Sequence, residues 1–97
     1  MLLITKFDIS ADIIDVPPFI INDIKSYQEQ FFIWLCDKNN DHAYWHYQGG
    51  KKYGLNYRSN ALIEWLNTFP LADYSEKAEA VEIDVSEYDK ALPSIFF

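Results

Sequence analysis

The sequence predicts an α+β fold over residues 1–97, a single domain in which one or two helices pack on a mostly antiparallel sheet of about four to five strands. Apolar and polar residues alternate near both ends of the chain, as is typical of half-buried strands. An apolar stripe with helical spacing follows residue 59, and turn-forming residues separate the segments. The chain contains 3 Trp, 7 Tyr and 7 Phe. These large rings can stabilise the one core that a chain of this length supports.

The first strand is predicted at residues 2–9, at the margin of the sheet, because apolar residues such as Leu3 and Phe7 share one face of it. Pro17 and Pro18 then end any regular element. Each proline lacks a backbone N–H and restricts the residue before it.

Residues 19–48 allow two interpretations. One is a single helix from about Phe19 to Asp37, with apolar residues on one stripe. The other is a short helical piece near residues 22–28, followed by a hairpin in which residues 30–37 pair with residues 42–48. We prefer the hairpin, because both of its strands are short and aromatic-rich and the residues between them are turn-forming Asn and Asp.

The second half of the chain gives clearer signals. Residues 49–54 hold three glycines and are predicted to be a turn. Ser59 is the expected N-cap of a helix over residues 60–69, which Pro70 ends. Its inward side is predicted to be Leu62, Ile63, Trp65, Leu66 and Phe69. Residues 79–85 read as a strand, residues 86–92 as a short helix or turn, and the apolar tail 93–97 is expected to pack on the core.

The net charge is −7, from 15 acidic and 8 basic side chains, and it is unevenly distributed. Seven acids and one base lie between residues 73 and 89, so this stretch contributes −6. Such asymmetry indicates a partner, here a basic protein surface that electrostatic steering would help to find. The predicted partner-binding residues are Asp73, Tyr74, Glu76, Glu79, Glu82, Asp84, Glu87, Tyr88 and Asp89. The alternative is that these acids only serve solubility and protect a strand edge.

Side chains that could bind a metal or catalyse a reaction gather between Cys36 and His46, but their pattern favours neither role. On the predicted strand, His42 and His46 would lie about 13 Å apart and could not share a zinc ion. Cys36 lies in an apolar run, where a buried and unreactive thiol is expected. We therefore expect no metal, no cofactor and no catalytic residue. An enzyme would require Cys36 or His46 to be accessible and reactive.

Nucleic-acid and membrane partners are not expected. The rings of Trp45, Tyr47, Tyr53 and Tyr57 could stack bases, but the negative charge would repel the phosphate backbone and anionic membranes. No apolar stretch approaches the roughly 18–20 residues that a membrane span needs. The first residues do not resemble a signal peptide, so we expect a cytoplasmic location.

The order of segments resembles a known group of proteins. An opening strand is followed by aromatic strands around Asp37–Asp41, the sequence Gly54-Leu55-Asn56-Tyr57, a helix with Ala61–Leu66, an acidic strand and the tail 92–97. This order is similar to that of the small immunity proteins of bacterial toxin systems, including those of contact-dependent growth inhibition. The resemblance implies an inhibitor that occludes the active site of a cognate toxin, often a basic nuclease. It assigns no single functional residue. The alternative function is a non-catalytic structural or adaptor subunit of a larger assembly.

Overall fold

Two sheets and three helices make up the parts of the chain that the computed structural model describes, residues 1–7, 10–82 and 91–97. The elements are β1 (Leu2–Lys6), β2 (Ala11–Asp15), α1 (Pro18–Asn22), α2 (Ile24–Cys36), β3 (Trp45–Gln48), β4 (Lys51–Leu55), α3 (Ser59–Thr68), β5 (Glu79–Val81) and β6 (Ser94–Phe96). This content confirms the predicted α+β class.

The larger sheet has the strand order β5-β2-β1-β6, with antiparallel pairing except between β1 and β6. The predicted position of the first strand at the margin of the sheet is wrong, because β1 lies between β2 and β6. Leu3, Ile4 and Thr5 are all buried, as expected for a strand covered on both faces. The strand β2 was missed, although Ile13 and Ile14 are buried in it.

The preferred hairpin over residues 30–48 is wrong, because residues 24–36 form α2. The alternative single helix is closer to the structure, although Asp23 separates α1 from α2. Phe31 and Leu35 are fully buried one helical turn apart. That stripe outweighs the β propensity of the aromatic residues around it. Cys36 follows Leu35 on the outer side and is exposed, contrary to the predicted buried thiol.

The smaller sheet is a hairpin of β3 and β4, which we call the arm (residues 45–55). Its turn is Gly49-Gly50, with φ of 60° and 77°. Positive φ at both central residues is what a tight hairpin turn requires. Residues 51–54, part of the turn predicted over residues 49–54, therefore belong to the strand β4, and β3 pairs with β4 instead of with residues 30–37.

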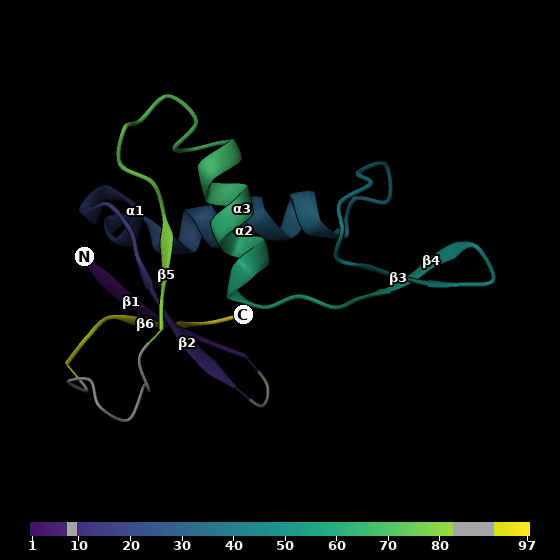
Figure 1. The fold of residues 1–97 in the computed structure, drawn as a ribbon, viewed down its shortest axis with the longest axis horizontal. Helices are drawn as coiled ribbons and strands as arrows, with labels where there is room; N and C mark the ends of the chain where they lie inside the picture. The colour runs from purple at the N-terminus through teal and green to yellow at the C-terminus, as the bar shows by residue number, and fades with distance from the viewer. Residues whose placement is uncertain (8–9, 83–90) are drawn as a thin grey trace.

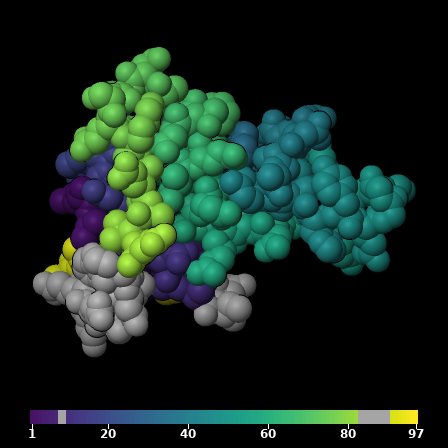
Figure 2. Space-filling model, viewed as in Figure 1, coloured from purple at the N-terminus to yellow at the C-terminus, as the bar shows by residue number. Residues whose placement is uncertain are grey.

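The arm projects from the rest of the molecule (Figures 1 and 2). The radius of gyration is 14.0 Å, whereas a compact domain of this length would have about 12.5 Å. The excess agrees with an extended arm on a compact body.

The predicted helix over residues 60–69 is confirmed with a shift of one residue, as α3. Ser59 is its first residue and not its N-cap. Its hydroxyl donates a hydrogen bond to Asp12 Oδ2 at 2.9 Å. Leu62, Trp65 and Leu66 are buried as predicted, whereas Phe69 is 51% exposed.

The core lies between the larger sheet and the helices α2 and α3 (Figure 1). Phe31 is at its centre, with ring contacts to Tyr57, Trp65 and Phe97. The tail packs on the core as predicted, because β6 pairs with β1 and Ile95 is buried. Of the predicted strand 79–85, β5 covers the start, and its residues 83–85 lie outside the described residues, as do residues 86–90.

Candidate functional site

The first half of the predicted partner-binding stretch forms a strip along one side of the molecule, from the loop after α3 into β5 (Figures 1 and 2). We call residues 73–82 the acidic segment. Asp73, Glu76, Glu79 and Glu82 are exposed in it, and Tyr74 is 53% exposed. Asp84, Glu87, Tyr88 and Asp89 lie outside the described residues, so they remain predictions.

The carboxylates of the acidic segment have no ion-pair partner among residues 1–7, 10–82 and 91–97. The one base of the segment, Lys77, does not neutralise them. Its ammonium group donates to the backbone carbonyls of Leu71 and Ala72. The cation therefore stabilises the loop while the negative charges stay available to a partner.

The loop that carries the segment is held by buried contacts. The side-chain amide of Asn67 accepts a hydrogen bond from the Ala78 N–H at 2.7 Å and donates one to the Ala78 carbonyl at 3.0 Å. Leu71 and Ala78 are buried. The ring of Tyr74 lies 5.1 Å from that of Phe19, centroid to centroid. The acids are thus displayed from a fixed frame, which lowers the entropy cost of binding.

The base of the arm is equally well held. The indole N–H of Trp45 donates to the Asn40 carbonyl at 2.6 Å, and its ring stacks on His42 at 5.1 Å. Lys52 places its ammonium group 5.5 Å from the Trp45 ring and forms an ion pair with Asp41. The hydrogen bond and the charge of Lys52 lower the pKa of the Asp41 carboxyl.

The rest of the arm is open to solvent. Tyr47 and Tyr53 are 51% and 74% exposed, and Lys51 is exposed as well. In the part of the chain that the structure describes, neither tyrosine ring contacts another ring and Lys51 has no ion-pair partner. The rings of Trp45, Tyr47, Tyr53 and Tyr57 do not form one aromatic platform, because Tyr57 packs against Phe31 in the core.

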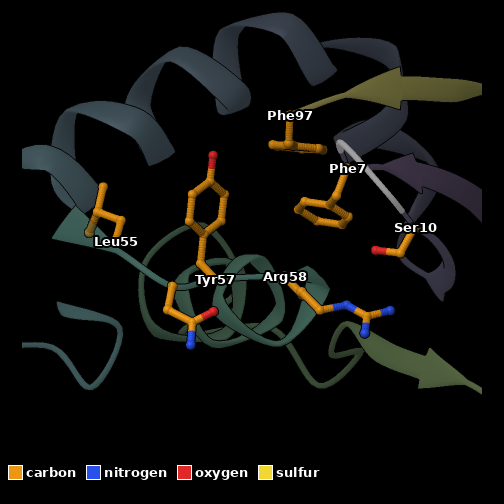
Figure 3. A pocket seen from close by; sticks show the side chains of 7 residues that line it. Phe7, Ser10, Leu55, Tyr57, Arg58 and Phe97 are labelled. Carbon is orange, nitrogen blue, oxygen red and sulfur yellow. The ribbon is translucent and has the colours of Figure 1, made fainter. Parts of the chain in front are cut away.

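A third feature, absent from the sequence prediction, is a groove beside the start of α3 (Figure 3). It consists of two adjoining cavities of about 350 and 330 Å³ that share Asn56, Tyr57 and Arg58. The rings of Phe7 and Phe97 form one wall.

Both oxygens of Asp12 are engaged beside this groove. Oδ1 pairs with the Arg58 guanidinium at 3.0 Å, and Oδ2 accepts from Ser59. This network fixes the linker between the arm and α3. The sequence could not reveal it, because Asp12 lies in the strand that was missed.

The candidate metal and catalytic residues are not brought together. His42 lies in the loop before β3, where Nε2 donates to the Leu35 carbonyl and Nδ1 accepts from the Tyr44 N–H. The expected separation from His46 along one strand therefore does not apply. Among the described residues, no group of three or more His, Cys, Asp and Glu side chains is arranged to hold a metal ion.

Cys36 and His46 are both exposed, so the accessibility that an enzyme would need is present. Neither side chain has a hydrogen-bond partner within the described ranges. A nucleophile and its base must lie within hydrogen-bonding reach of each other. The structure shows no such pair for these two residues.

No helix in the described ranges combines the length and the apolar character that crossing a membrane requires. No protein-family model, curated protein or solved structure matches this chain.

Proposed function

We propose that this protein is an immunity protein, which binds a cognate bacterial toxin and neutralises it by occluding its active site. The observation that carries the proposal is the acidic segment, whose exposed carboxylates have no ion-pair partner in the described residues while Lys77 is bound to the backbone. Part of the segment order shared with small immunity proteins, namely the opening strand, the helix α3 and the packed tail, is present and supports the same function, whereas the aromatic hairpin around Asp37–Asp41 is not.

The expected target is a basic protein surface, such as the cleft of a nuclease domain. Lys and Arg side chains there would pair with Asp73, Glu76, Glu79 and Glu82, and Tyr74 would add a partly buried aromatic contact. The undescribed Asp84, Glu87, Tyr88 and Asp89 are proposed to extend the same surface. Acids at the rim of such an interface mainly accelerate association. Replacing a fully buried, paired acid weakens the binding free energy by about 2–5 kcal/mol.

In this proposal the protein acts by binding alone, in the cytoplasm, without cofactor, nucleic acid or membrane. A single well-held acidic surface is sufficient for such a role. Nucleophilic catalysis by Cys36 would need a base in contact with its thiol, and among the described residues His46 does not supply that contact.

The test is co-expression with the product of the reading frame upstream of this gene. We expect that product to end in a small basic toxin domain, whose expression stops growth unless this protein is present. The variant Glu76→Gln/Glu79→Gln should protect less well than the wild type. The variant Asp23→Asn/Glu29→Gln changes the net charge equally at exposed sites outside the acidic segment and should protect fully. Equal protection by both variants would contradict the proposal.

The exposed arm favours a second function, an adaptor subunit that binds through aromatic residues. Tyr47 and Tyr53 are exposed without any ring contact in the described residues, as is common for residues that become buried at an interface. The two functions differ in salt dependence. Affinity that falls steeply with ionic strength supports the toxin inhibitor, and affinity that hardly changes supports the adaptor.

A further inference from the structure

The described contacts explain little of the stability of the outer part of the arm. A two-stranded hairpin is only marginally stable in water without further packing. Contacts of Trp45 and Lys52 hold the base of the arm, as described above. The outer part, with Tyr47, Lys51 and Tyr53, has no comparable contact among the described residues.

The arm also differs in charge from the rest of the chain. It contains Lys51 and Lys52 and no acid, which gives +2, so the other residues together carry −9. Asp41 neutralises Lys52, which leaves Lys51 as the unpaired cation of the arm within the described ranges. The acidic segment has the complementary properties, with unpaired carboxylates beside the half-exposed ring of Tyr74.

The arm lies at one end of the longest dimension of the molecule, which measures 44 Å, and the acidic segment lies in the other half of the molecule (Figure 1). The arm therefore cannot reach the acidic segment of its own chain, but it can reach that of a second copy. In a two-fold symmetric dimer, each arm would meet the acidic segment of the other subunit, so the contact forms twice. Forming the contact twice matters because the surface of one arm is small compared with the roughly 800 Å² that each partner buries in a stable interface.

We propose that this protein forms a two-fold symmetric homodimer in which the arm of each subunit docks on the acidic segment of the other. Lys51 pairs with the carboxylates of residues 73–82, and Tyr53, two residues further along the same strand, packs beside Tyr74. Electrostatic complementarity fixes the pairing, and the aromatic rings supply the apolar contact. The dimer and the proposed toxin complex use the same acidic segment, so a toxin would have to displace the arm of the second subunit. The dimer itself is tested with the purified protein alone, without a toxin.

The experiment is sedimentation velocity on the full chain over a wide concentration range, at low and at high ionic strength. We expect dimers at low ionic strength that dissociate as salt screens the charges. Lys51→Glu should raise the dimer dissociation constant about tenfold or more, because it converts two attractive contacts into repulsive ones. Lys25→Glu makes the same charge change at an exposed position of α2 and should leave the dimer unchanged.

A charge exchange makes the test specific. Glu76→Lys alone should also weaken the dimer, because Lys51 then faces a lysine. When the Lys51→Glu and Glu76→Lys proteins are mixed, one contact of the heterodimer joins the two substituted side chains, which again have opposite charges. The other contact joins the native Lys51 to the native Glu76. A heterodimer should therefore form about as tightly as the wild-type dimer.

Two results would overturn the proposal. One is a monomer at every concentration in low salt, which would mean that the arm does not bind a second copy of this chain. The other is a dimer that Lys51→Glu does not weaken. Circular dichroism of each variant checks that it is folded, and Tyr53→Ser provides a variant of unchanged charge that should also weaken the dimer.

Discussion

Replacing Asn67 with alanine should loosen the frame of the acidic segment. The Asn67 side chain makes two hydrogen bonds to the backbone of Ala78, at 2.7 and 3.0 Å. Ala78 is only 3% exposed, so water cannot easily replace the lost partner. A buried backbone group without a partner costs about 1–3 kcal/mol. Asn67→Ala leaves two such groups without a partner, and relaxation of the loop recovers part of the loss. We therefore expect the free energy of unfolding to fall by about 2–4 kcal/mol.

Urea denaturation measures this loss, and hydrogen exchange at the Ala78 amide locates it. Asn67→Asp should keep one of the two hydrogen bonds, because a carboxylate can accept from the Ala78 N–H but cannot donate to the Ala78 carbonyl. The control is Thr68→Ala at the neighbouring exposed position, which should change stability by no more than about 0.5 kcal/mol. A loss below that value for Asn67→Ala would refute the view that this side chain holds the loop.

Two further predictions concern the core and the loop before β3. Phe31→Ala should destabilise the fold by about 3–5 kcal/mol in denaturant titration, since Phe31 is fully buried at the centre of the ring contacts; a loss under about 1 kcal/mol would contradict that position. Burial, and then the charge and hydrogen bond of Glu64, raise the pKa of Tyr44. The stability from this shift is complete below the unfolded-state tyrosine pKa of about 10 and is lost as pH rises through the folded-state pKa. Tyr44→Phe should therefore lose stability less steeply in this alkaline range, and an unchanged slope would exclude the interaction.

The sequence predicts the elements whose signal is local. The helix α3 follows from the spacing of Leu62, Trp65 and Leu66, which are buried as that spacing requires. The apolar tail around Ile95 packs on the sheet because it has no alternative way to leave water. These features, with the overall class, needed no knowledge of distant contacts.

The errors arise where a distant contact decides between two local possibilities. The aromatic residues of α2 are also good strand residues, and the contact of Phe31 with Trp65 of α3 favours the helix. The pair Ile13 and Ile14 does not alternate, because β2 is buried on both faces inside the sheet. Gly49-Gly50 was identified as a turn, but the strand that follows it was not.

Some features of the candidate site could also be predicted from the sequence and others could not. That the acids of residues 73–82 are exposed could be predicted from composition alone. The role of Asn67 could not, because its two bonds join residues eleven positions apart around an irregular loop. The position of Lys77 was equally hidden, since a base among seven acids suggests an ion pair and not a bond to the backbone.

The central claim is that the acidic segment meets a positively charged protein surface. The most direct measurement is the Kd, by calorimetry, between the toxin domain encoded upstream and a variant carrying Asp73→Asn, Glu76→Gln, Glu79→Gln and Glu82→Gln. We predict an affinity at least about a hundredfold weaker than that of the wild type, equivalent to roughly 2.7 kcal/mol. An unchanged Kd, in a variant shown to be folded, would contradict the claim.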